Sequence, residues 1–125
     1  MNFSKVRYCS TSGGEQISFE TACVYQEQGG FSRVTFSNGL TNYTIVVSKT
    51  KLNIKANGDI SYDLSLSKNL KSEYLVKAQG ISFKAEVFCK NLTVSTNSDS
   101  VLIDCEYTTD LSGYSQSFVV SIIIF

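Results

Sequence analysis

The alternation of apolar and polar residues over residues 49–66 constrains the fold of this chain more than any other feature. Leu52, Ile54 and Ala56 alternate with polar residues, and apolar residues then occupy every second position from 60 to 66. A spacing of two places side chains on one face of a β-strand, whereas an amphipathic helix needs a spacing of three to four. The pattern therefore predicts two strands, each with one buried face.

The residues between these two strands predict a tight turn. Asn57-Gly58-Asp59 interrupts the alternation. Asn-Gly accepts positive φ at both central positions, as a type I′ hairpin turn requires. We therefore expect a β-hairpin at residues 50–66.

The same alternation recurs along the chain, and no segment has a helical period. It predicts further strands at residues 3–11, 16–26, 33–36, 43–47, 73–78, 81–89 with a continuation at 92–95, 101–107 and 114–125, with a polar turn or an irregular loop at 67–72. Short turns join most of them, which favours a barrel over a Greek-key sandwich, because the sandwich needs longer crossovers. A closed barrel also leaves no exposed strand edge. We predict an all-β chain with one domain over residues 1–125, a single antiparallel up-and-down β-barrel of about eight to ten strands.

Composition excludes several classes of function. The chain has 125 residues, no histidine, and 11 basic against 11 acidic residues. Without histidine, Ser-His and Cys-His nucleophiles and histidine metal sites are excluded, so we expect no catalytic residues, no metal, no cofactor and no enzyme activity. The balanced charge indicates no nucleic-acid partner. No apolar run approaches the roughly 18 residues of a membrane span, so we expect no membrane partner either.

The four cysteines lie too far apart in sequence for a common zinc or redox pattern. Cys9, Cys23, Cys89 and Cys105 lack the pairs two to four residues apart that such sites use. An even number would suit two disulfides in a secreted protein. The first residues, however, lack the apolar core of a signal peptide. We expect reduced, largely buried thiols and a cytoplasmic location.

The apolar faces of the predicted strands place a set of aromatic residues inside the barrel. The inward set includes Tyr62, Tyr74, Phe83, Tyr107 and Phe118. Barrels of this size either hold a small apolar ligand or are filled by their own side chains. The first four residues of the set are the candidate ligand-binding residues, since tyrosine hydroxyls could bind polar groups of a ligand; the alternative is that they are core aromatics.

Two functions follow from these alternatives. The first is a barrel that binds a small hydrophobic or amphipathic ligand in its interior. The second is a non-enzymatic structural or protein-interaction module with a solidly packed barrel, whose surface contacts a partner or a second copy in a homo-oligomer. A cavity of a few hundred Å³ would distinguish the first from the second.

From residue 43 to the C-terminus the layout of strands and turns resembles the YwiB-like family, small uncharacterised bacterial proteins grouped with the calycins. The resemblance includes the turn glycine Gly58, the strand at 73–78 before Gly80, and Asp104-Cys105-Glu106-Tyr107 before a turn at Gly113. It departs at Ala56, where the family usually has arginine, and at Val34-Thr35-Phe36, where the family tends to have a tyrosine and a glutamate. The resemblance implies a lipocalin-like barrel and carries no assigned activity.

Overall fold

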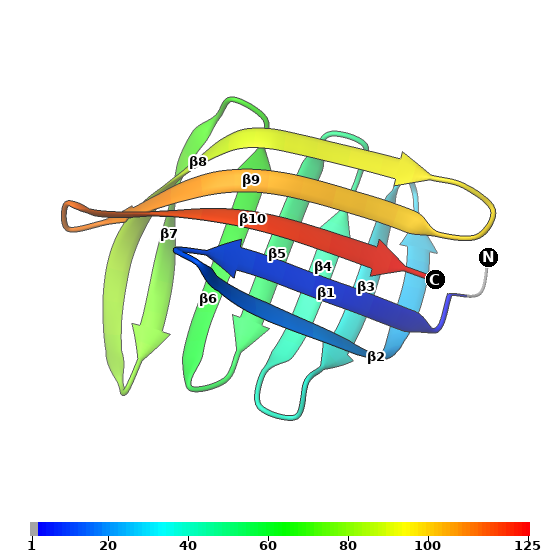
Figure 1. Ribbon diagram of the computed structural model, residues 1–125, viewed down its shortest axis with the longest axis horizontal. Coiled ribbons are helices and arrows are strands. Elements are labelled where there is room, and N and C mark those ends of the chain that lie inside the picture. The colour runs from blue at the N-terminus through cyan, green and yellow to red at the C-terminus, as the bar shows by residue number, and fades with distance from the viewer. Residues whose placement is uncertain (1–2) are drawn as a thin grey trace.

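The computed structural model describes residues 3–125, which form ten antiparallel strands closed into one barrel (Figure 1). Each strand pairs with its neighbours in sequence, and β1 pairs with β10 to close the barrel. This confirms the predicted all-β, up-and-down architecture. The strands are β1 (Lys5–Ser12), β2 (Glu15–Gln28), β3 (Phe31–Ser37), β4 (Asn42–Val47), β5 (Lys51–Asn57), β6 (Ile60–Ser67), β7 (Lys71–Ala78), β8 (Ile81–Thr96), β9 (Val101–Leu111) and β10 (Tyr114–Ile124).

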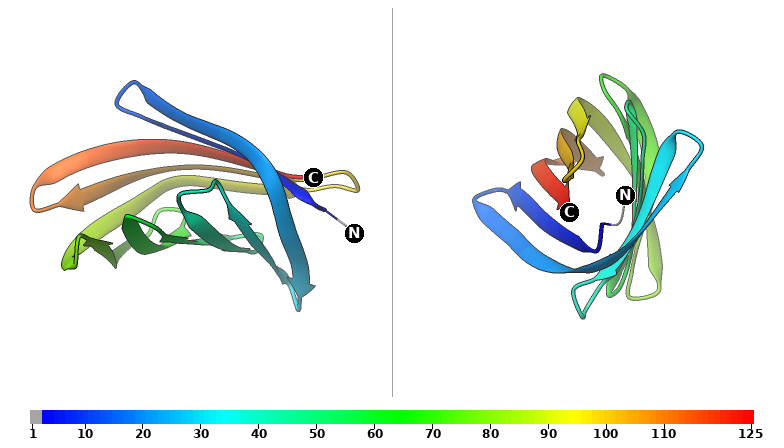
Figure 2. Two further views of the ribbon diagram at one scale, coloured as in Figure 1. Left: turned by 90° about the horizontal axis from the view of Figure 1, so that it is seen from below. Right: turned by 90° about the vertical axis from the view of Figure 1, so that its right-hand side faces the viewer.

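The barrel is flattened, with two groups of strands that cross at a steep angle (Figures 1 and 2). Strands β8, β9, β10 and β1 run across the front of Figure 1, and β3 to β7 run steeply behind them. The two longest strands, β2 with 14 residues and β8 with 16, curve to join the two groups. Their length is what allows one continuous sheet to close on itself.

Four of the hairpins are two-residue turns in which both loop residues have positive φ. These turns are Gly13-Gly14, Gly29-Gly30, Gln79-Gly80 and Ser112-Gly113. Positive φ at both positions is the requirement of a type I′ turn, and its twist matches that of the flanking strands. Short turns of this kind fix the register of the strands that they join.

The hairpin at residues 50–66 is confirmed, but the type I′ turn predicted at its tip is wrong. Neither Asn57 nor Gly58 has positive φ. A Cβ atom on Gly58 would lie 2.8 Å from Thr41 Oγ1 and 3.0 Å from the Leu40 carbonyl oxygen. Glycine is therefore needed here because the loop between β3 and β4 packs directly against the turn.

A β-bulge in β8 reverses which face its residues present. Cys89 pairs with Tyr107 and Asn91 with Glu106, so Lys90 has no partner on β9. The extra residue turns Leu92 into the core, whereas without it Leu92 would lie on the outer face with Phe88. The bulge joins the predicted segments 81–89 and 92–95 into one strand.

Several other strand boundaries also differ from the prediction, those of β7 and β9 among them. Strand β7 begins at Lys71, inside the predicted loop, because Asn69 and Leu70 already exchange backbone hydrogen bonds with Cys89 on β8. Strand β9 continues to Leu111, into the predicted turn.

The inward-facing side chains form one apolar core over most of the barrel. No buried residue between positions 3 and 125 is charged or polar.

The backbones of Lys5 and Phe125 exchange hydrogen bonds of 2.8 and 2.9 Å, which extend the β1–β10 seam at the end where the two termini lie (Figure 1). No helix among the described residues could span a membrane. The fully buried side chains include Val6, Val34, Ile45, Leu52, Ile54, Leu66, Val87, Ile103, Val120, Ile122 and Ile124.

Candidate functional site

The barrel is open at the end away from the termini, because neighbouring strands stop pairing there. Strand β8 pairs with β9 only from Glu86 onward, although β8 begins at Ile81. Strand β10 pairs with β1 only from Val119 onward, although β10 begins at Tyr114. The tip of the β9–β10 hairpin therefore extends past both of its neighbours, as the free turn in Figure 1 shows.

A mostly apolar cavity of about 340 Å³ lies inside this open end. It lies between β6, β7 and β8 on one side and the β9–β10 hairpin on the other. Its volume lies within the range of small-molecule sites. The lining residues are Ile60, Tyr62, Leu64, Tyr74, Val76, Ala85, Tyr107, Thr109, Leu111, Tyr114, Gln116 and Phe118.

Three of the four predicted site residues line this cavity together. Tyr62 comes from β6, Tyr74 from β7 and Tyr107 from β9, and the Tyr107 ring stacks on Phe118 with 5.1 Å between ring centroids. The alternation of each strand points these rings inward, as expected. Their role in ligand binding stays a prediction.

Phe83, the fourth predicted residue, is placed differently. It pairs with Val76 on β7, but it is 40% exposed and does not line the cavity. The expectation that it lies inside the barrel is therefore wrong. The physical reason is that β8 has no partner on its β9 side before Glu86, so no paired strand flanks Phe83 on that side.

Burial keeps the phenol groups around the cavity protonated. It raises the pKa of Tyr62 to about 12, with a further contribution from Tyr43, while the Tyr8 hydroxyl opposes the change. Burial is also the main reason why the pKa values of Tyr8, Tyr74 and Tyr107 lie above their ordinary value. A phenolate would lose its hydration in such a site, and no cation lines the cavity to compensate it.

The Tyr107 hydroxyl is a deeply buried polar group at the cavity. Tyr107 is only 5% exposed, and its hydroxyl forms no hydrogen bond within residues 3–125. In that part of the chain, every side-chain oxygen or nitrogen that is fully shielded from solvent has a hydrogen-bond partner. The Tyr107 oxygen has none, so it is not fully shielded. The hydroxyl oxygen must therefore border the free space of the cavity.

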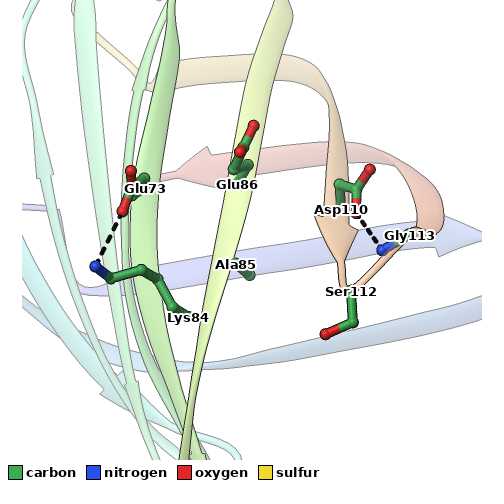
Figure 3. Close-up of a pocket in the computed structure, with 7 residues that line it drawn as sticks. All are labelled: Glu73, Lys84, Ala85, Glu86, Asp110, Ser112 and Gly113. Carbon is green, nitrogen blue, oxygen red and sulfur yellow. Dashed lines mark hydrogen bonds and ion pairs between the residues drawn. The ribbon is translucent and has the colours of Figure 1, made fainter.

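A second recess of about 400 Å³ adjoins the cavity where β8 separates from the β9–β10 turn (Figure 3). This recess is bordered by charged side chains. Ala85 lines both spaces. Three carboxylates border the recess in adjacent strands, since Glu73 pairs with Glu86 and Glu86 with Asp110. Lys84 Nζ lies 3.4 Å from Glu73 and Lys71 Nζ 2.7 Å from Glu86, while Asp110 accepts a 2.9 Å hydrogen bond from the Gly113 amide.

Four residues that line the cavity were not predicted from the sequence to face inward, namely Thr109, Leu111, Tyr114 and Gln116. The predicted strands ended at residue 107 and resumed at residue 114, so the inward set on β9 stopped at Tyr107. The period of two continued past that point: Tyr107, Thr109 and Leu111 share one face of β9, and Gln116 pairs with Thr109 across the hairpin. Extending the alternation up to the glycine at position 113 would have identified them.

The cysteines and carboxylates form no metal-binding cluster in the described part of the chain. All four cysteines are free thiols; Cys89 and Cys105 are buried, but Cys9 and Cys23 are partly exposed. Burial raises the pKa of Cys105 to about 12, which makes its thiol a poor nucleophile. No group of three or more cysteine, aspartate or glutamate residues between positions 3 and 125 could hold a metal ion.

The fold and the cavity together define a class: a small, closed, ten-stranded up-and-down β-barrel with an apolar cavity at one end. Within that class, the chain belongs to the DUF1934 family, a domain of unknown function, whose sequence model matches residues 4–120.

Among solved structures, the chain is similar to the crystal structure of the ywiB protein from Bacillus subtilis. The TM-score is 0.74 at 12% sequence identity, over 98% of this chain and 90% of that one. This similarity supports the barrel fold that the family resemblance implied. No curated protein matches the chain.

Proposed function

We propose that this protein is a non-enzymatic binding barrel that accepts a small hydrophobic or amphipathic molecule in the cavity at its open end. The observation that carries the proposal is the 340 Å³ space bordered by apolar and tyrosine side chains. A mostly apolar lining with a few polar groups is typical of small-molecule sites. The opening of the cavity, where strand pairing ends, gives a ligand a route of entry.

The contrast between the two ends of the barrel supports this function. At the end near the termini the interior is filled by fully buried aliphatic side chains such as Ile45 and Ile124. At the other end β6 to β10 border free space. The alternative function, an interaction module with a solidly packed barrel, is less well supported because the open end is not packed.

Nuclear magnetic resonance with a small apolar probe tests the proposal. Cumene has nine non-hydrogen atoms, and about 0.5 kcal/mol for each gives a dissociation constant near 0.5 mM. Cumene is expected to shift the methyl resonances of Leu64, Val76 and Leu111, which line the cavity. The resonances of Ile45 and Ile124 at the packed end should not move.

Two substitutions on one strand provide a matched control. Val76→Phe adds a ring to the cavity and should abolish binding of cumene. Leu75→Phe adds a ring at the next residue, whose side chain is 51% exposed on the outer face, and should bind like the wild type. Equal binding by both variants, or absence of any shift with the wild type, would disprove the proposed function.

A further inference from the structure

The cavity has no group that could balance a charge on its ligand. None of its twelve lining residues is Asp, Glu, Lys or Arg. Transfer of an unpaired ion from water into such a site is far more costly than transfer of a neutral group. The part of a ligand that enters the cavity is therefore uncharged.

The cavity does contain a deeply buried hydrogen-bond donor, the Tyr107 hydroxyl, that has no partner among residues 3–125. Tyr107 is almost completely buried, and its hydroxyl borders the free space without a hydrogen bond to residues 3–125. The other polar groups nearby are partly used, since Gln116 donates to Ser12 Oγ at 2.9 Å and Thr109 contacts the Gln116 carbonyl oxygen at 3.5 Å. The phenol at position 107 remains protonated, so it is available as a neutral donor.

The charges beside the opening disfavour an anion as well. The adjoining recess carries the carboxylates of Glu73, Glu86 and Asp110 (Figure 3). The two nearby lysines are already paired, Lys84 with Glu73 and Lys71 with Glu86. An acidic head group at this edge would meet negative charge without a free cation to bind it.

We propose that the cavity selects an uncharged molecule with a hydrogen-bond acceptor, bound by the Tyr107 hydroxyl, and that it rejects the carboxylate of the same shape. This inference rests on the proposed binding function and adds the chemical class of the ligand. A ketone, ester, ether or alcohol attached to an apolar body belongs to this class. A fatty or aromatic carboxylate does not.

Three molecules of nearly equal shape test this selectivity by the same methyl resonances. Acetophenone has a neutral carbonyl acceptor, benzoate is its anionic counterpart, and cumene is the hydrocarbon. At pH 8 acetophenone is expected to bind at least as tightly as cumene, and benzoate at least 100-fold more weakly than acetophenone. Benzoic acid has a pKa of about 4, like other carboxyl groups. Its apparent affinity should therefore rise about tenfold for each pH unit from 8 toward 5, while that of acetophenone stays constant.

Tyr107→Phe tests the role of the hydroxyl. Loss of one neutral hydrogen bond should weaken acetophenone about fivefold and leave cumene within twofold. Tyr25→Phe is the matched control, because it also removes one phenol hydroxyl, but the Tyr25 hydroxyl contacts Glu27 and Ser32 and Tyr25 does not line the cavity. This control should bind both molecules like the wild type.

The outcomes separate the two proposals. If cumene and acetophenone bind but benzoate binds equally well at pH 8, or if Tyr107→Phe weakens both neutral molecules alike, the selectivity proposed here is wrong and the binding function stands. If none of the three molecules binds, both proposals fail.

Discussion

Gly58 gives the sharpest test of how the turn between β5 and β6 is built. Its φ is not in the left-handed region, so alanine fits the backbone conformation without strain. The added Cβ, however, would lie 2.8 Å from Thr41 Oγ1, and ordinary contact begins at 3.4 Å, so the neighbour has to retreat by about 0.6 Å. It would also lie 3.0 Å from the Leu40 carbonyl oxygen, which belongs to the backbone and cannot rotate away.

We expect Gly58→Ala to lower the free energy of unfolding by about 2 kcal/mol, within the 1–3 kcal/mol typical of an overpacked site. For a chain of this size that corresponds to a fall in Tm of roughly 6–10 °C. Urea and thermal unfolding followed by circular dichroism measure both quantities. Gly58→Asn should be at least as destabilising, because the larger side chain meets the same atoms.

Gly113 provides the contrasting case. Its φ is +85° and a Cβ there would meet nothing within 4 Å, so Gly113→Ala should cost about 1 kcal/mol through backbone strain. Asparagine tolerates positive φ, so Gly113→Asn should be more stable than Gly113→Ala. If Gly58→Asn were also more stable than Gly58→Ala, or if Gly58→Ala changed stability by less than 0.5 kcal/mol, the explanation by crowding against Thr41 would be wrong.

Three further predictions concern the core, a loop and the response to alkaline pH. Ile103→Ala removes a fully buried side chain and should lower the free energy of unfolding in urea by about 2–5 kcal/mol. Leu102→Ala, on the partly exposed outer face of β9, should lower it far less. Equal losses of stability in the two variants would contradict the assigned faces. Asn97→Ala should lower the free energy of unfolding by about 1 kcal/mol, because Asn97 Oδ1 accepts hydrogen bonds of 2.8 and 2.9 Å from the amides of Asp99 and Ser100 in the β8–β9 loop. An unchanged urea midpoint would show that these bonds contribute nothing to stability. Burial raises the pKa of Tyr62 to about 12 in the folded protein, so the stability that this phenol contributes is complete below pH 10 and is lost as the pH rises from 10 to about 12. Urea midpoints that stay constant across that window would contradict the burial of Tyr62.

Much of the fold could be predicted from local patterns. The alternation assigned the inner face of β5, β6, β9 and β10 correctly, as the burial of Leu52, Ile54, Leu64 and Ile103 shows. Such patterns are predictive because the period of a strand is fixed by its backbone, independently of its partners. Tyr62, Tyr74 and Tyr107 were placed in the barrel for the same reason.

Features that depend on neighbours in space were beyond these patterns. The same Asn-Gly sequence that favours a type I′ turn adopts another conformation at Gly58, because the β3–β4 loop occupies the adjacent space. Lys90 has no partner on β9, and the change of face that this causes along β8 can be recognised only when the pairing of β8 with β9 on both sides of Lys90 is known. Phe83 has the correct alternation for the interior, but the strand that should cover it ends its pairing at Glu86.

The sequence by itself determined that the chain is a meander of antiparallel strands with one apolar face, because alternation and glycine turns act within a few residues of each other. Only the tertiary structure decided which part of that apolar face is packed and which part borders free space. Whether a side chain such as Tyr107 is core or cavity wall depends on how far β6, β8 and the β9–β10 hairpin diverge at the open end. That divergence is set by where pairing between strands stops, which is a property of the closed barrel and of no single strand.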